Sequence, residues 1–163
     1  MALRTVLVFP DSRLRNIAEP VNSFDSTLEV LANDMAETMY AENGIGLAAI
    51  QINEKHRVIT VDVSEDQSEL MTFVNPEIIA TDGEQICQEG CLSVPEIYAD
   101  VTRAEKITVT AQDIKGESFT IEASGLLAVC IQHEIDHLDG KVFVDYLSPA
   151  KRQRIQKKML KRK

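Results

Sequence analysis

The sequence predicts an α+β fold built as one domain, residues 1–163, in which mixed, mainly antiparallel β-sheets pack around a central buried helix and a further helix forms the C-terminus. A length of 163 residues is typical of one domain. Apolar residues recur at helical spacing in two long segments, and β-branched residues alternate at strand spacing between them. Hydrophobic residues make up 44% of the chain and charged residues 26%, which indicates a globular protein rather than a disordered one.

The N-terminal third is expected to contain one strand and one long helix. Residues 5–9 are predicted to form a strand, followed by a helical turn that begins after Pro10. Ser26 and the glutamate three residues later match a capping box, so we expect a helix over residues 26–42. The pair Asn43-Gly44 should end that helix.

The middle of the chain is predicted to form antiparallel strands. Residues 57–63 and 70–74 are strand-like, with a polar turn between them. Apolar residues alternate with threonines over 107–111, and Lys115-Gly116 then turns the chain into a second strand at 119–121. We expect these two strands to form a hairpin.

A second helix is expected to be buried, because it is apolar on two sides. It should begin after Ser124 and end near Leu138, with Gly140 just beyond its C-terminus. Its second half nevertheless contains four ionisable residues, namely His133, Glu134, Asp136 and His137. Burying such groups is costly unless each has a partner, and a metal ion would supply one.

The C-terminal segment differs from the rest of the chain in charge. Ser148 and Pro149 are expected to start a third helix, and residues 150–163 contain eight Lys or Arg and no acidic residue. The preceding 149 residues contain nine basic and 26 acidic residues, a balance of −17, whereas the whole chain carries −9. We therefore expect no non-specific nucleic-acid binding by the acidic body, but the basic helix is a candidate for it.

Membrane and export signals are not recognised in the sequence. The apolar run at 126–131 is far too short to span a bilayer, and the N-terminal apolar patch lacks a small-residue cleavage site. Three cysteines, Cys87, Cys91 and Cys130, are an odd number, which favours unpaired thiols in a reducing cytoplasm. The sequence thus predicts a cytoplasmic protein without a membrane partner.

The segment 133–137 reads His-Glu-Ile-Asp-His, an H-E-x-x-H motif on the predicted buried helix. Residues four apart are neighbours on a helix, so both imidazoles can reach one ion while Glu134 lies beside it. A tetrahedral catalytic site needs a third protein ligand and one open position. His56, the cysteines and several carboxylates are candidates for that ligand. The alternative to a metal site is a pair of hydrogen-bonded helix histidines.

Two further segments are suggestive, although neither is specific alone. Cys91 lies in the non-helical stretch 89–95, where Gly90 permits close backbone approach, but an inert buried thiol is the simpler reading of an isolated cysteine. In the stretch 44–51, two glycines could cap the preceding helix or expose backbone to a ligand, and Gln51 could be a buried amide donor.

Taken together, GIGLAAIQ at 44–51, EGCLS at 89–93 and HEIDH at 133–137 closely resemble the three signature motifs of peptide deformylases, which remove the N-formyl group from nascent bacterial polypeptides. The resemblance extends over nearly the whole chain. One departure lies outside the motifs, because many such enzymes have a basic residue shortly after the second motif, where this chain has Ile97 and Tyr98.

The resemblance implies a metallohydrolase that acts in N-terminal protein processing on N-formylmethionyl peptides. It implies one divalent metal ion per chain, Fe²⁺ in the family, with Zn²⁺, Ni²⁺ or Co²⁺ able to replace it. A metal-bound hydroxide would attack the formyl carbon. The implied metal ligands are Cys91, His133 and His137, and the implied catalytic groups are Glu134 as general acid and base and Gln51 with the backbone N–H of Leu92 as oxyanion donors.

Substrate contacts are expected from two regions. The peptide backbone would lie as an added strand near Ile45, Gly46 and Gly90. Its methionine side chain would meet an apolar wall on the buried helix, formed by Leu126, Val129 and Cys130. Glu89 and Arg103 are expected either to support the metal ligands or to form an ordinary surface ion pair.

Two other functions remain possible from the residues. A zinc endopeptidase shares H-E-x-x-H, although no histidine follows His137 to serve as its usual third ligand. A non-enzymatic, metal-stabilised module could dock on the ribosome through the basic helix at 150–163. Docking to ribosomal RNA through that helix is also a candidate partner interaction for the deformylase itself, which we expect to be a monomer.

Overall fold

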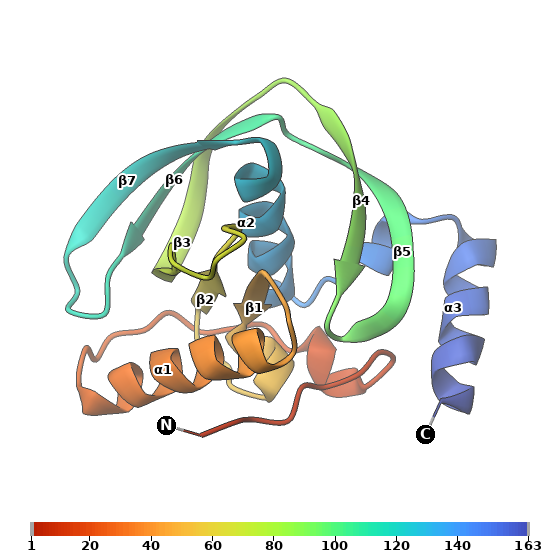
Figure 1. The fold of residues 1–163 in the computed structure, drawn as a ribbon, viewed down its shortest axis with the longest axis horizontal. Helices are drawn as coiled ribbons and strands as arrows, with labels where there is room; N and C mark the ends of the chain where they lie inside the picture. The colour runs from red at the N-terminus through yellow and green to blue at the C-terminus, as the bar shows by residue number, and fades with distance from the viewer. Residues whose placement is uncertain (1, 163) are drawn as a thin grey trace.

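The structure is a computed structural model that describes residues 2–162 (Figure 1). Its long helices are α1 (Ser26–Ala41), α2 (Gly125–Leu138) and α3 (Pro149–Lys161), and its short 3₁₀ helices are η1 (Ser12–Arg15), η2 (Ala49–Ile52) and η3 (Phe143–Tyr146). Lys163, the last residue of the predicted basic segment, lies outside the described residues. Within residues 2–162, no helix is both long and apolar enough to cross a membrane.

The strands form two separate antiparallel sheets. A five-stranded sheet has the order β1-β2-β3-β6-β7, and a two-stranded sheet joins β4 to β5. Their bounds are β1 (Gly46–Ala48), β2 (Val58–Val61), β3 (Met71–Asp82), β4 (Gln85–Cys91), β5 (Val94–Arg103), β6 (Lys106–Gln112) and β7 (Ser118–Ser124). The predicted α+β class with antiparallel sheets is confirmed.

Helix α2 packs against the five-stranded sheet, and the β4–β5 hairpin stands on its other side (Figure 1). Ile131 and Leu138 of α2 are fully buried against sheet residues such as Phe73 and Val109. A second apolar cluster joins α3 to the hairpin, and a third joins α1 to β1 and β2. Every element that carries one of the three sequence motifs therefore borders α2 or belongs to it.

Two predictions for the N-terminal third are wrong. Residues 5–9 form no strand, because Leu7 N–H donates to Gln51 O and Phe9 N–H to Ser93 O, each at 2.7 Å, so the segment bonds two different elements instead of one ladder partner. The helix cap is Asp25 rather than Ser26. The Asp25 carboxylate accepts from the backbone N–H groups of the second and third helical residues, which makes Ser26 the first residue of α1.

The mid-chain strands differ from their predicted limits, because β2 is shorter than the predicted 57–63 whereas β3, β6 and β7 are longer than predicted. Strand β3 continues eight residues past Val74, because a bulge at Asn75 and Pro76 leaves the proline, which has no N–H, outside the ladder, and pairing with β6 resumes at Glu77. Strands β4 and β5 were not predicted as strands. Their turn places Cys91 at the tip of the hairpin. Ser124 does precede α2, but its side chain makes no capping bond within the described chain.

The ends of α2 and the start of α3 agree with the sequence. Gly140 follows α2 with a φ of 78°, and a Cβ there would lie 2.7 Å from the Arg15 carbonyl oxygen, so glycine is required. The Ser148 hydroxyl accepts from Lys151 N–H at 3.3 Å, with Pro149 in the first turn of α3. The 139–148 segment is thereby anchored on both sides.

We expect Ile131→Ala to destabilise the protein by about 2–5 kcal/mol, because it leaves a cavity between α2 and the sheet where the side chain is fully buried. Ile79→Ala is the matched control, since Ile79 on β3 is 55% exposed, and it should cost no more than about 1 kcal/mol. Urea unfolding of both variants measures the difference. Equal losses would contradict the packing described for α2.

Candidate metal centre

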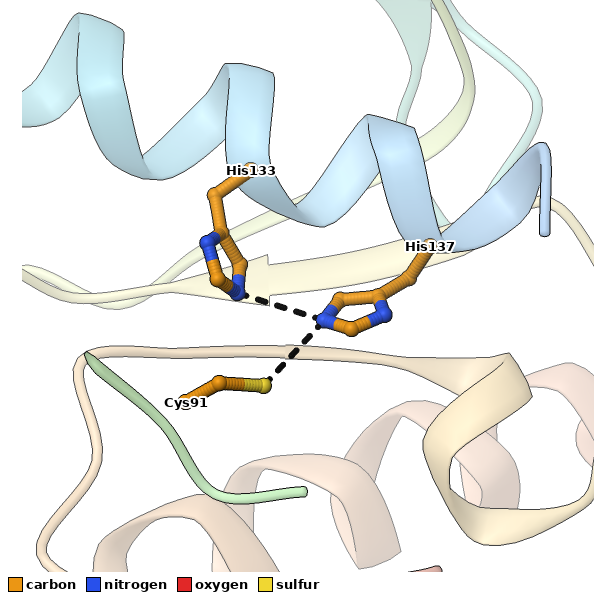
Figure 2. A group of neighbouring side chains, drawn as sticks. All are labelled: Cys91, His133 and His137. Carbon is orange, nitrogen blue, oxygen red and sulfur yellow. Dashed lines mark hydrogen bonds between the residues drawn. The ribbon is translucent and has the colours of Figure 1, made fainter. Parts of the chain in front are cut away.

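Three side chains from two elements converge in the interior. His133 and His137 lie one turn apart on α2, and Cys91 reaches them from the tip of the β4–β5 hairpin (Figure 2). The Nε2 atoms of the two histidines are 3.2 Å apart, and His137 Nε2 is 3.3 Å from Cys91 Sγ. One potential ligand atom from each residue lies within 4.8 Å of the others.

These three side chains fit a divalent transition-metal ion. A thiolate and two neutral imidazoles are the ligands that Zn²⁺, Fe²⁺ and related ions take in proteins. Both histidines are buried, and His137 Nδ1 has no hydrogen-bond partner among the residues described. His56 does not join the group, because it is half exposed beside Glu54. Among the candidates for a third ligand that the sequence left open, Cys91 is the one that groups with both histidines within the described residues.

Glu89 and Arg103 are a buried pair, so the reading of them as a surface ion pair is wrong. Arg103 donates from Nε and Nη2 to the two oxygens of Glu89 at 2.7 and 2.8 Å. Glu89 Oε1 also accepts from His133 Nδ1 at 2.8 Å. Burial opposes ionisation of Glu89, but its bonds from Arg103 and His133 outweigh burial and lower its pKa. Since a carboxylate only accepts, His133 carries its proton on Nδ1 and presents Nε2 to the centre.

Glu134 follows His133 on α2 and is buried. Burial raises the pKa of Glu134 to about 7. Its Oε1 has no hydrogen-bond partner within residues 2–162, while its other oxygen approaches Gly46 so closely that a Cβ there would clash with it. A buried carboxyl with a free oxygen and a pKa near neutrality can take up or release a proton.

Gln51 in η2 is fixed by bonds on both ends of its amide. Its Oε1 accepts from Ala48 N–H at 2.9 Å, and its Nε2 donates to Ser93 Oγ at 3.0 Å and lies 3.5 Å from Cys91 Sγ. Leu92 lies between Cys91 and Ser93 in the hairpin turn. Ser93 was not predicted as a site residue, although its position in the EGCLS segment, two residues after Cys91, could have indicated it.

The centre opens into a cavity of about 490 Å³. Its walls come from residues 42–46, Gln51, residues 90–92 and 94–98, His133 and Glu134. Among these are the predicted backbone contacts Ile45, Gly46 and Gly90, and also Ile97 and Tyr98, whose ring lies so close to Gly90 that a Cβ there would be 2.6 Å away.

The predicted apolar wall on α2 is not part of this lining. Val129 and Cys130 are buried, and Leu126 is 49% exposed. Cys130 Sγ lies 3.5 Å from the Ile45 carbonyl oxygen, directly behind the cavity wall, and burial raises the pKa of its thiol. Contact of these three residues with a substrate side chain stays a prediction.

Comparison with known proteins gives a consistent result. Residues 3–153 match the family model described as polypeptide deformylase. A peptide deformylase of Pseudoalteromonas translucida is 56% identical over 161 residues, covering 99% of this chain and 96% of the relative. A peptide deformylase of Burkholderia multivorans is 56% identical over 162 residues, covering 99% and 90% respectively.

Solved structures agree with these relatives. A peptide deformylase from Legionella pneumophila has a TM-score of 0.94 at 52% identity, covering 98% of this chain and 95% of its own. One from Ehrlichia chaffeensis in complex with actinonin has a TM-score of 0.95 at 38% identity, covering 100% and 99%. With the family model matching most of its length, the chain belongs to the polypeptide deformylase family.

Proposed function

We propose that the whole chain, residues 1–163, acts as one catalytic domain that hydrolyses the N-formyl group from N-formylmethionyl peptides and releases formate. The convergence of Cys91 Sγ with the Nε2 atoms of His133 and His137, beside an open cavity that Cys91 and His133 line, carries this proposal. Membership of the deformylase family supports it. In this view α2 is the central scaffold that sets both histidines and the acid/base on one face.

Cys91, His133 and His137 would hold one divalent cation, which when bound would lower the pKa of a water molecule and polarise the formyl oxygen. The thiolate adds one negative charge to two neutral imidazoles, so the set suits a soft or borderline ion. We propose Fe²⁺ as the native ion on the family resemblance, with Zn²⁺, Ni²⁺ or Co²⁺ as substitutes.

Glu134 is the proposed general acid and base. It would accept a proton from the attacking water at its unpaired Oε1 and return it to the amine as the carbon–nitrogen bond of the formamide breaks. Burial raises the pKa of Glu134, which favours holding the proton between the two transfers.

Gln51 and the backbone N–H of Leu92 are the proposed donors to the oxyanion. The Gln51 amide is held by Ala48 and Ser93, so it does not need to reorganise during the reaction. Leu92 follows the ligand Cys91 directly, which keeps its backbone close to the centre. A preorganised donor of this kind is typically worth about 2.7–4 kcal/mol of transition-state stabilisation.

We propose that the peptide backbone lies along Ile45–Gly46 and Gly90, which all line the cavity. The methionine side chain would contact the α2 face formed by Leu126, Val129 and Cys130. The contact of Cys130 with the Ile45 carbonyl supports this placement, since it joins that face to the cavity wall.

The basic helix α3 is the proposed docking element for the ribosome. Its buried face is apolar, with Ile155 and Met159, whereas its Lys and Arg side chains are exposed. Phosphate contacts would therefore use one face while the other holds the helix on the domain. We further propose a monomer in the cytoplasm, where the free thiols Cys87, Cys91 and Cys130 stay reduced.

Glu134→Gln should reduce formate release from a formyl-Met peptide by about 10²–10⁴-fold, because the amide cannot carry the transferred proton. Metal content should be unchanged. Glu29→Gln, on the exposed face of α1, is the matched control and should behave as the parent. If the parent protein cleaves casein and leaves the formyl peptide intact, the chain is an endopeptidase. If Glu134→Gln is fully active, it has no catalytic role.

Removal of the metal by a chelator should abolish formate release, and Fe²⁺, Co²⁺ or Ni²⁺ should restore it. Because a ferrous ion beside a thiolate is readily oxidised, peroxide should inactivate the Fe²⁺ form faster than the Ni²⁺ form. Elemental analysis of protein purified without oxygen identifies the native ion. Equal peroxide sensitivity of the two forms would count against native Fe²⁺.

Replacement of Lys157, Lys158 and Lys161 by Gln should weaken co-sedimentation with ribosomes and flatten its salt dependence, since three phosphate contacts are lost. These residues are exposed, so the apolar face of α3 is retained. The control replaces three exposed lysines elsewhere, Lys106, Lys115 and Lys141, so that the net charge of the protein changes by the same amount. Equal binding by the two triple variants would show that α3 is not the docking element.

A further inference from the structure

A continuous series of polar side chains leads from His133 away from the catalytic cavity. His133 contacts Glu89, and Glu89 is held by two bonds from Arg103. On its other side, Arg103 donates from Nη1 to Asp136 Oδ2 at 2.6 Å. The Tyr146 hydroxyl donates to the same oxygen of Asp136 at 2.7 Å. The series therefore ends at Tyr146, two partners beyond the pair Glu89–Arg103.

Arg103 joins the outer residues, Asp136 and Tyr146, to Glu89. Its side chain is only 4% exposed, and Nε, Nη1 and Nη2 are each bonded to a carboxylate. Its guanidinium also lies over the Tyr146 ring, with 4.9 Å from Cζ to the ring centre. A planar guanidinium clamped on both sides cannot rotate, so Glu89 cannot leave His133 without breaking these contacts.

We propose that Asp136 and Tyr146 are positioning residues for the metal centre, acting through Arg103 and Glu89 on His133. The inference rests on the proposed metal site. Two carboxylates against one guanidinium leave a net negative charge behind the imidazole, which favours a cation at its Nε2. Without Asp136, the guanidinium charge would be balanced by Glu89 alone, and the carboxylate would polarise His133 less.

The outer end of this series can be changed without opening the core. Arg103, Asp136 and Tyr146 line a second cavity of about 350 Å³, away from the catalytic cavity. Tyr146 is 49% exposed, and its change to Phe removes a hydroxyl but keeps the ring beside Arg103. Asp136→Asn keeps the shape of the side chain and removes its charge.

The test is the affinity of the protein for Co²⁺, measured by competition with a chelator at a temperature where every variant is folded. Asp139→Asn is the control for Asp136→Asn, because Asp139, at the C-cap of α2, also pairs with an arginine, Arg57, at 3.1 Å but does not contact the series. Tyr40→Phe is the control for Tyr146→Phe, since its hydroxyl also bonds an aspartate, Asp62, at 2.6 Å.

Loss of a direct partner of a metal-binding histidine typically costs about 10–100-fold in affinity, so we expect that range for Glu89→Gln and about 3–10-fold for Asp136→Asn, one step further out. Tyr146→Phe should cost about 2–3-fold on the same scale. Both controls should stay close to the parent. The thiolate-to-Co²⁺ absorption band of the parent gives a spectrum against which changes at the centre are seen.

A double variant separates positioning from general stability. If Asp136 acts through Glu89, adding Asp136→Asn to Glu89→Gln should weaken Co²⁺ binding no further. Additive losses, or an Asp136→Asn variant that binds as tightly as Asp139→Asn, would overturn the proposal. In those cases the parent still binds Co²⁺ and releases formate. A parent that binds no Co²⁺ would overturn the metal site itself, and the positioning role with it.

Discussion

The short separation between one sulfur and two imidazole nitrogens is the constraint on which the structure depends. Cys91 Sγ lies 3.3 Å from His137 Nε2, which in turn lies 3.2 Å from His133 Nε2, and both histidines are buried. Lone pairs this close repel one another unless they share a proton or a cation, and all three atoms together can bind one divalent cation. Each neighbouring element fits this demand: the sheet supports α2, the hairpin carries the cysteine, and Glu89 orients one imidazole.

Much of the fold could be predicted because its signals are local. Helical spacing predicted α2, the pair Ser148-Pro149 predicted the start of α3, and strand alternation predicted β6 and β7. The wrong predictions concern segments whose structure is set by contacts between distant parts of the chain. The segment 5–9 has a strand-like sequence, but its N–H groups donate to η2 and to the turn of the β4–β5 hairpin. Strands β4 and β5 lack a strong strand pattern and are formed because they pair with each other.

The site shows the same division. The H-E-x-x-H spacing determines which two imidazoles meet, because residues four apart share a helix face. Cys91 was identified only through the resemblance of three motifs, since nothing local links it to His133, which is 42 residues later in the chain. Tyr146 had no sequence signal, because its role depends on where the loop after α2 brings it back to Asp136. Arg103 was ambiguous for a related reason, since its burial is set by packing alone.

The account is tested most directly by X-ray absorption spectroscopy of the metal-loaded protein. It predicts one sulfur and two imidazole nitrogens in the first coordination shell, together with an oxygen from solvent. Cys91→Ser should remove the sulfur signal and leave both nitrogens. A shell without sulfur in the unchanged protein, or one filled by four protein ligands, would contradict the account.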